Sequence, residues 1–308
     1  MRNDLMKIVV TGGAGFIASH IVDAYIAKGH TVIVIDDLSK GFKKNLDPKA
    51  TFYKADITDL DAMRRILKKE RPDIVSHHAA IAVVAESMRD PIPTMQVNVV
   101  GTTNVLVAAG EAGVKKILFA SSAAVYGNPK RIPIDEEAAK EPISPYGLSK
   151  LLGEETIKCH ARIFGFTYCI FRYANVYGER QNPKGEGGVV AIFADIMRNG
   201  EHPTIFGDGT KTRDYVYVGD IARANVLGLT KGTNVIVNLA RGEEVTDRQV
   251  FETIAKNLKF AGEPIWQPMR EGEIVRSFLN AQKAQEILGW RAATDFEAGI
   301  RRMLNQSK

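Results

Sequence analysis

The segment from Lys7 to Ala18, KIVVTGGAGFIA, constrains the fold of this chain more than any other. A run of β-branched residues stops at a glycine cluster, and an apolar segment with helical spacing follows as far as Ala27. Strand, tight turn and helix is the setting that a dinucleotide-binding fingerprint requires. Gly12 permits the sharp turn, Gly15 lets the backbone approach a pyrophosphate, and the free N–H groups of the helix favour an anion. Ala18 takes the third small position and still allows close packing of helix and strand.

A second predicted strand, residues 31–35, ends in the acidic pair Asp36 and Asp37. These acids follow the fingerprint by about twenty residues, the spacing at which a carboxylate binds the adenosine ribose hydroxyls. Asp36 would also repel the 2′-phosphate of NADP. The two features together predict a binding site for NAD.

The first half of the chain alternates strand-like and helix-like segments. Strands are predicted at 7–11, 31–35, 51–54, 73–76, 116–120 and 167–172. Helices are predicted at about 16–28, 59–70, 95–112 and 145–164. This alternation predicts an α/β fold with a Rossmann-type doubly wound parallel sheet, whose ligands bind along the carboxyl ends of the strands.

The pattern changes beyond residue 178, where glycine and charged residues become frequent. Segment 214–238 returns to strand, helix and strand, and could rejoin the main sheet. Further helices are predicted at about 189–199, 246–259, 281–288 and 295–305. We therefore predict a NAD-binding domain from residues 1–177 and about 214–240. A smaller mixed α/β lobe from about 178–213 and 241–308 would bind the substrate.

Composition excludes several classes of protein. The 308 residues are 45% hydrophobic and 25% charged, as in ordinary globular proteins. No apolar run is long enough for a membrane span, and the first residues lead directly into a strand, so we expect no signal peptide. Two cysteines make no disulfide framework, and no metal cluster is apparent, which favours the cytoplasm. The net charge of +5 comes from short, scattered pairs that indicate solvated surface rather than a nucleic-acid site.

Tyr146 and Lys150 form the second strong motif, because residues at i and i+4 lie on one face of a helix. A lysine ammonium beside a phenol favours phenolate and lowers the pKa of the tyrosine from about 10. Such a tyrosine can accept the proton of a sugar or alcohol hydroxyl near neutral pH. Pro142 and Pro145 precede the motif and are typical of the start of a helix.

Two serines follow the predicted strand 116–120, at the same sheet edge as the glycine turn. Ser121 and Ser122 could cap the next segment, or donate a hydrogen bond to a reacting oxygen. The fingerprint and the Tyr146–Lys150 pair favour the catalytic donor.

These motifs together resemble the extended short-chain dehydrogenase/reductase family, and within it the NAD-dependent nucleotide-sugar epimerases of the UDP-glucose 4-epimerase type. The resemblance covers nearly the whole chain. It rests on TGGAGFI at 11–17, DI at 56–57, HHAA at 77–80, SSAAVYG at 121–127, YGLSK at 146–150, RYANVYG at 172–178, FGDGTKTRDYVY at 206–217 and REGE at 270–273.

The resemblance implies a cofactor site in which Asp36 binds the adenosine ribose, Asp56 and Ile57 flank the adenine, and Lys150 holds the nicotinamide ribose. The full set of implied NAD-binding residues is Gly12, Gly15, Phe16, Ile17, Asp36, Asp37, Asp56, Ile57, Ala79, Ala80, Asn98, Ser121, Tyr146, Lys150 and Tyr173.

The resemblance also implies the catalytic and substrate-binding residues. Tyr146 would be the base, Lys150 would lower its pKa, and Ser122 would bond the sugar O4. The UDP diphosphate would be held by Asn175, Arg213 and Arg270, and the uridine ribose by Glu273. The alternative for the two arginines is surface salt bridging. Ser277 stands where side-chain size controls the C2 substituent of the sugar, and a serine leaves space for an N-acetyl group.

The implied reaction is NAD-dependent epimerisation at C4 of a UDP-hexose through a transient 4-keto sugar, by a homodimer joined through helices 95–112 and 145–164. A 4,6-dehydratase needs a carboxylate directly after the catalytic serine, where this chain has Ala123 and Ala124. A UDP-glucuronate 4-epimerase and a nucleotide-sugar reductase stay open as alternatives. A NAD-bound scaffold without catalysis has no need of a tuned phenol and is disfavoured. One departure from some epimerases is Ala82, where they carry a lysine.

Overall fold

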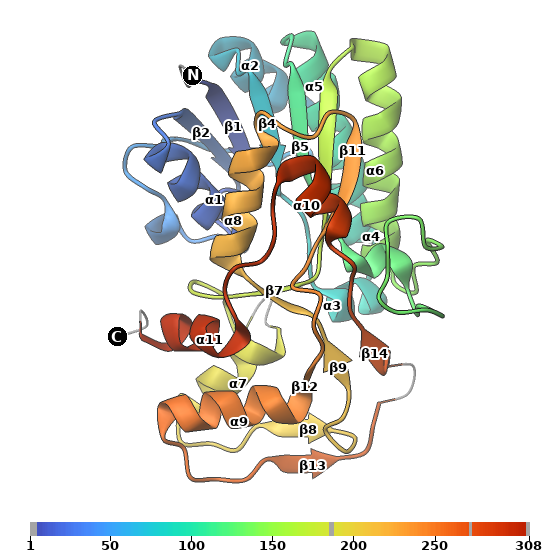
Figure 1. Cartoon of the computed structure of the whole chain (residues 1–308). Helices are drawn as coiled ribbons and strands as arrows, with labels where there is room; N and C mark the ends of the chain where they lie inside the picture. The colour runs from blue at the N-terminus through green and yellow to red at the C-terminus, as the bar shows by residue number, and fades with distance from the viewer. Residues whose placement is uncertain (1–4, 185–187, 271–272, 306–308) are drawn as a thin grey trace.

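A seven-stranded parallel sheet forms the larger part of the molecule (Figure 1). The computed structural model of the chain describes residues 5–184, 188–270 and 273–305. The strands are β1 (Lys7–Thr11), β2 (Thr31–Asp36), β3 (Thr51–Lys54), β4 (Ile74–His77), β5 (Lys116–Ser122), β6 (Thr167–Tyr173) and β11 (Val235–Leu239). Their order in the sheet is β11-β6-β5-β4-β1-β2-β3. Starting from β1, the chain adds β2 and β3 on one side and then β4, β5, β6 and β11 on the other, so the order of addition switches sides between β1 and β4. The predicted doubly wound parallel sheet is confirmed, and such a reversal is where ligands bind.

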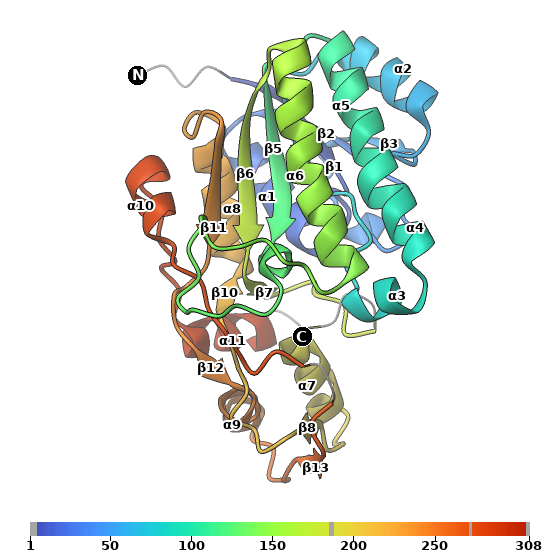
Figure 2. The ribbon, with the colours of Figure 1, turned by 90° about the vertical axis from the view of Figure 1, so that its right-hand side faces the viewer.

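Helices cover both faces of this sheet (Figure 2). One face carries α1 (Phe16–Ala27), α8 (Val218–Gly228) and α10 (Gln282–Leu288). The other face carries α2 (Leu60–Glu70), α5 (Thr102–Glu111) and α6 (Pro145–Phe164). Both helical layers bury apolar side chains against the sheet, so the core consists of two hydrophobic clusters on its opposite faces. None of the helices in the described part of the chain combines the length and apolar character that a membrane crossing needs.

Helix α6 has the bounds that the sequence predicts, because both of its ends carry clear signals. The Ser144 side chain accepts a hydrogen bond from the Gly147 N–H at 3.1 Å, and Pro145 takes the first helical position. Gly165 adopts the left-handed conformation that ends the helix. At Gly153 an added Cβ would lie 2.7 Å from the Phe119 ring, so this glycine lets α6 approach β5 closely.

The predicted helix 95–112 is not one regular α-helix. Short helices α3 (Val84–Arg89) and α4 (Pro91–Met95) lead into a π-helical turn, η2 (Gln96–Gly101), and α5 begins only after it. Irregular turns of this kind are common beside functional sites. Here the turn carries Asn98, whose side chain bonds to the loop after β4.

Short strand pairs build the smaller part of the molecule, at the bottom of Figure 1. Strand β7 (Asn175–Tyr177) pairs with β10 (Tyr215–Tyr217), and β8 (Thr204–Phe206) pairs with β13 (Ile265–Gln267). Strand β9 (Thr212–Arg213) lies between β12 (Val245–Thr246) and β14 (Arg276–Ser277). A third apolar cluster packs among α7 (Val189–Arg198), α9 (Asp247–Leu258) and α11 (Phe296–Asn305). Within segment 214–238, β11 joins the main sheet and β10 does not; the division into two domains stays a prediction.

Candidate functional site

A cavity of about 330 Å³ opens at the carboxyl ends of β1, β2, β4 and β5, where the strand order reverses. This volume is within the range of cofactor and small-molecule sites. In Figure 2 the carboxyl ends of β5 and β6 point toward the smaller part of the molecule. All but one of the predicted cofactor residues line the cavity: Gly12, Gly15, Phe16, Ile17, Asp36, Asp37, Asp56, Ile57, Ala79, Ala80, Ser121, Tyr146, Lys150 and Tyr173.

The glycine turn is shaped to admit a ligand backbone. Gly12 has φ +69°, and a Cβ added there would lie 2.7 Å from the backbone of Ala79, at the end of β4. The Gly15 N–H donates to the Gly12 carbonyl at 3.0 Å. A Cβ added at Gly15 meets only that carbonyl, at 3.1 Å, and otherwise faces open space. The turn is therefore closed toward the sheet and open toward the cavity, as the pyrophosphate of NAD requires.

Asp36 is fixed beside this turn. Its side chain is buried, and its two carboxylate oxygens accept hydrogen bonds from the Ala14 N–H at 3.0 Å and the Leu38 N–H at 2.8 Å. Burial raises the pKa of Asp36, and these two hydrogen bonds oppose that rise. A carboxylate has about four acceptor positions, so capacity remains for two ribose hydroxyls. The residues present therefore fit the adenosine half of NAD.

Asn98 lies behind the cavity wall instead of in it. Its Oδ1 accepts from the Ile81 N–H at 2.8 Å, and its Nδ2 donates to the Ile81 carbonyl at 2.9 Å and to the Ser149 hydroxyl at 2.9 Å. Because Ala79, Ala80 and Ile81 line the cavity, Asn98 shapes the site by holding this loop against α6.

Lys150 is buried and lines the cavity. Its Nζ donates to the Ala120 carbonyl at 2.8 Å and lies 5.9 Å from the centroid of the Tyr146 ring. The backbone N–H of Tyr146 donates to the Ser87 hydroxyl at 3.2 Å, which ties the start of α6 to α3. The structure thus brings the predicted base and the predicted lysine together at one end of the cavity.

Ser122 caps the turn that follows β5, because its Oγ accepts a hydrogen bond from the Ala124 N–H at 3.1 Å. A serine hydroxyl that accepts in this way can still donate its own proton. The two interpretations left open by the sequence, capping and donation, are therefore compatible. The Ser121 hydroxyl is directed elsewhere, since it donates to Glu154 at 2.5 Å.

Three of the predicted substrate residues gather around Asp214. The Asn175 N–H donates to the Asp214 carbonyl at 2.9 Å, and Arg213 is the preceding residue. Ser277 lies beside Arg213 in the register of β14 and β9. None of these residues lines the cavity, so they form a neighbouring group on the smaller part of the molecule.

Arg270 and Glu273 make contacts of their own. The guanidinium of Arg270 lies 3.7 Å from the centroid of the Phe206 ring. The carboxylate of Glu273 pairs with Lys211 at 2.7 Å, and Asp247 lies 3.2 Å from the same ammonium. Among the ion pairs of the described residues, none includes Arg213 or Arg270, and the Arg213 guanidinium donates to the Thr212 carbonyl at 2.7 Å.

The cavity is also lined by residues that the sequence analysis names without assigning them to the cofactor, Ala18, His78 and Ala82, and by residues that it did not name: Ile35, Ser39, Lys40, Gly41, Ala55, Ile81, Val97 and Ala120. Most stand within a few residues of a strand end, and that position was the available signal. His78 stacks on Tyr173 with ring centroids 6.5 Å apart. Burial, and next the charge of Lys150, lower the pKa of His78 to about 3, so its imidazole is neutral at physiological pH.

Comparisons with known proteins agree with this geometry. The model of the NAD dependent epimerase/dehydratase family matches residues 8–240. A putative UDP-glucose 4-epimerase from Methanocaldococcus jannaschii is 48% identical over 302 residues, with 98% of each chain covered. The UDP-glucose 4-epimerase of Thermotoga maritima, solved with UDP-glucose, has a TM-score of 0.95 and 43% identity and covers 97% of this chain and 98% of its own. The UDP-N-acetylglucosamine 4-epimerase of Methanobrevibacter ruminantium, solved with UDP-N-acetylmuramic acid, has a TM-score of 0.92 and 34% identity, with 98% and 97% covered.

Proposed function

This chain belongs to the NAD dependent epimerase/dehydratase family, and on that premise we propose that it interconverts UDP-glucose and UDP-galactose by epimerisation at C4. The predicted family and its NAD cofactor are confirmed. The observation that carries the proposal is that Tyr146 and Lys150 lie close together and line the same cavity as the glycine turn and Asp36. A non-catalytic scaffold would not need this pair.

Asp36, Lys150 and the glycine turn would hold NAD⁺, which would supply reversible hydride exchange with the sugar C4. Tyr146 would take the proton of the 4-hydroxyl as that hydride leaves, with the Lys150 ammonium stabilising the phenolate. Ser122 would donate a hydrogen bond to the sugar O4 and hold it beside the phenol. After the 4-keto sugar has turned its other face, Tyr146 would give the proton back.

Inversion at C4 requires the sugar to turn without leaving, so the nucleotide must stay bound. We assign this anchoring to Asn175, Arg213 and Arg270 at the diphosphate and to Glu273 at the uridine ribose. Arginine suits the task because its planar fork pairs with two phosphate oxygens. We propose that Asn175 and Arg213 act together, since both are tied to Asp214.

We further propose that UDP-N-acetylglucosamine and UDP-N-acetylgalactosamine are substrates. Ser277 lies beside Arg213 in a two-residue strand, and its small side chain leaves room for a C2 substituent. Ser277→Tyr should lower turnover of the N-acetyl sugars at least tenfold more than turnover of UDP-glucose. Undetectable turnover of UDP-N-acetylglucosamine by the unaltered protein, with good turnover of UDP-glucose, would contradict this proposal.

The test of the main proposal is incubation of the purified protein with UDP-galactose and no added NAD, followed by proton NMR. Appearance of UDP-glucose without net NADH is the expected result, because the cofactor is regenerated in each cycle. No conversion even with added NAD would contradict the proposal. UDP-glucuronate and an NADH-coupled reductase assay belong in the same panel, because they represent the two alternative reactions.

We propose that the protein is a homodimer. The pairing through helices 95–112 and 145–164 stays a prediction, and we add the adjoining α3 and α4 to this face: both pack against α6, and Met88, Ile92 and Leu148 on these three helices are 60%, 73% and 40% exposed. Exposed apolar side chains on helices that pack together favour a protein interface, and a second copy of the same chain is the commonest partner of a soluble protein. Light scattering should give a dimer, and the double variant Ile92→Glu and Leu148→Glu should give a monomer. Phe42→Glu, at an apolar side chain that is 44% exposed elsewhere, should leave the dimer intact.

We also propose that the protein is cytoplasmic. Its two cysteines, exposed Cys159 and buried Cys169, are both free in the structure, as expected in a reducing compartment. Fractionation of the source cells with an antibody against the protein would test this.

A further inference from the structure

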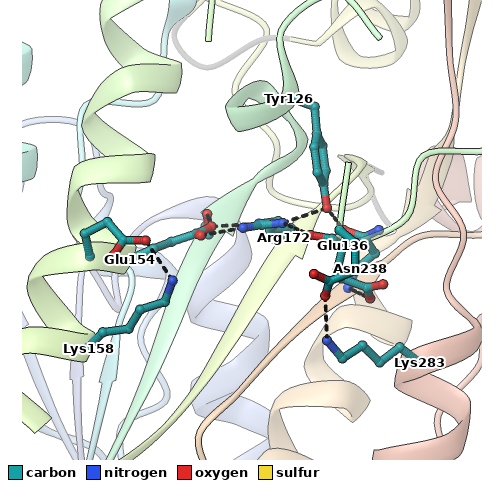
Figure 3. A network of polar contacts seen from close by, with 10 residues as sticks. Tyr126, Glu136, Glu154, Lys158, Arg172, Asn238 and Lys283 are labelled. Carbon is teal, nitrogen blue, oxygen red and sulfur yellow. Dashed lines mark hydrogen bonds and ion pairs between the residues drawn. The ribbon is translucent and has the colours of Figure 1, made fainter. Parts of the chain in front are cut away.

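Helix α6 carries a buried acidic side chain one turn after Lys150. Glu154 is fully buried, and its carboxylate pairs with Arg172 of β6, which is 2% exposed (Figure 3). The pair is bidentate: Arg172 Nε donates to Oε1 at 2.9 Å, and Nη2 donates to Oε2 at 2.7 Å. Burial alone would lower the pKa of Arg172, but the hydrogen bonds and charge of Glu154, together with the contacts with Tyr126, outweigh burial and raise that pKa. The guanidinium therefore stays charged in the core.

This ion pair also holds the end of strand β5. Ser121 is paired with Arg172 in the register of β5 and β6, and its hydroxyl donates to Glu154 Oε1 at 2.5 Å. One helical turn earlier, Lys150 donates to the carbonyl of Ala120 at 2.8 Å. Two polar contacts from α6 thus fix the two residues immediately before Ser122.

The other side of the pair reaches β11 and the loop that follows η3 (Ala123–Tyr126). Arg172 Nη1 donates to the Tyr126 hydroxyl at 2.9 Å and to the Glu136 carbonyl at 3.1 Å. The Tyr126 hydroxyl donates to Asn238 Oδ1 at 2.7 Å, and the Asn238 N–H donates to the Glu136 carboxylate at 2.7 Å. Figure 3 shows this network running from α6 to β11. Arg172 therefore has hydrogen-bond partners on both sides.

We propose that Glu154, paired with Arg172, is a positioning residue for the epimerisation: it holds the Ser121–Ser122 strand end against α6 and so fixes the Ser122 hydroxyl relative to Tyr146. This inference rests on the proposed function. Well-packed apolar residues often stabilise a core as well as a buried ion pair does, so stability alone does not explain the charges. Directed hydrogen bonds do select one arrangement, and a shift of about 1 Å in a reacting group can lower the rate about a hundredfold.

Two variants test the inference, and a third is the matched control. Ser121→Ala removes the hydroxyl that joins the strand to Glu154 and keeps the ion pair. Glu154→Gln breaks the pair itself. Glu155→Gln changes the next residue of the same helix, whose side chain is 60% exposed and pairs with Lys158 at 2.7 Å. Each holoenzyme is assayed below its own unfolding temperature for kcat, for KM of the UDP-sugar and for NAD content.

We expect Ser121→Ala to lower kcat about tenfold and Glu154→Gln about a hundredfold, with KM and NAD content within twofold of the unaltered protein. The acid limb of the kcat–pH profile should also move to higher pH in Ser121→Ala. The reason is that a displaced strand end carries Lys150 away from the phenolate that it stabilises. Glu155→Gln should change neither kcat nor the profile by more than twofold.

Ser121→Ala decides the question if Glu154→Gln does not fold, because it leaves the buried ion pair in place. Kinetics of Ser121→Ala equal to those of Glu155→Gln would overturn the positioning role while leaving the proposed function intact. A loss confined to KM would overturn it too. An unaltered protein that turns over no UDP-sugar would overturn the proposed function, and this inference with it.

Discussion

The cofactor cavity differs in construction from the substrate group, by which we mean the predicted substrate residues Asn175, Arg213 and Ser277 on the smaller part of the molecule. The cavity is lined by the ends of neighbouring strands of one large sheet, with Gly12 after β1, Asp36 at the end of β2 and Ala79 after β4. The substrate group stands on strands of two or three residues, with Asn175 on β7, Arg213 on β9 and Ser277 on β14. A long parallel ladder fixes the first site, whereas the second depends on a few individual contacts.

One buried carboxylate gives the substrate group much of its order. Asp214 accepts hydrogen bonds from the backbone N–H groups of Arg241 at 2.9 Å, Gly242 at 3.0 Å and Leu279 at 3.3 Å. Its own carbonyl accepts from Asn175 at 2.9 Å. We therefore expect NAD binding to be sensitive to larger side chains at the glycine turn. Binding of the UDP-sugar should depend on the carboxylate of Asp214.

The largest effect should come from the residue that we place in the reaction itself. Tyr146→Phe removes the proton acceptor and should lower kcat by about 10³-fold or more, with NAD and UDP still bound. Initial rates and NAD content of the purified variant measure this. Tyr53→Phe, at a tyrosine that bonds to Glu70 on α2 far along the sheet edge, should keep full activity. Wild-type turnover by Tyr146→Phe would exclude the mechanism.

Added bulk on the cofactor side should be the next most harmful change. Gly12→Ala places a Cβ 2.7 Å from the Ala79 backbone in a left-handed conformation, which costs about 3 kcal/mol or more in strain and overpacking. We expect NAD content to fall below about a tenth of that of the unaltered protein. Gly113→Ala has the same strained conformation, with φ +76°, but no atom within 4 Å, and should keep its NAD. Equal NAD content in the two variants would show that the contact with Ala79 is unimportant.

The same contrast explains what the sequence could predict. The glycine turn, the acids after β2 and the ends of α6 carry local signals, so the main sheet and most of its cavity were predictable. The resemblance implied that Asn98 belongs to the cofactor site, but the π-helical turn that holds Asn98 behind the cavity wall has no recognisable sequence pattern. Strands of two or three residues have no periodicity, so the pairing of Ser277 with Arg213 could not be derived from local sequence. Only the family resemblance suggested a shared site for them.

A charged residue inside a predicted strand indicates a buried polar partner. Arg172 lies in an otherwise apolar strand, and an arginine that is buried there needs a partner. Glu154 stands on the same helical face as Tyr146 and Lys150, at the same four-residue spacing. The pairing of Glu154 with Arg172 still required the structure, because it depends on how α6 packs across β5 and β6.

The free energy of unfolding should depend on pH because Asp214 changes its charge. Burial raises the pKa of Asp214 to about 6, against 3.8 in an unperturbed chain. The folded state therefore binds the proton more tightly, so the associated stability is present below about pH 4 and is lost as pH rises to about 6. Relative to Asp214→Asn, the free energy of unfolding should fall by about 2 to 3 kcal/mol across this interval. Urea unfolding of both proteins at a series of pH values measures the difference, and parallel curves would contradict the assignment.

The smallest expected effect is that of Asp214→Asn on substrate binding, and it tests most directly whether the substrate group and the cofactor cavity are independent. Asp214→Asn at pH 7.5 replaces an acceptor-only carboxylate with an amide that cannot accept all three backbone N–H groups, so the 241–242 and 279 segments loosen. KM for the UDP-sugar should rise about tenfold, because Asn175 and Arg213 lose their fixed places, while NAD content stays unchanged. Asp208→Asn, at an exposed turn that bonds to the Thr210 N–H, should leave both quantities unchanged. A loss of NAD in Asp214→Asn without any rise in KM would mean that the two sites share one support after all.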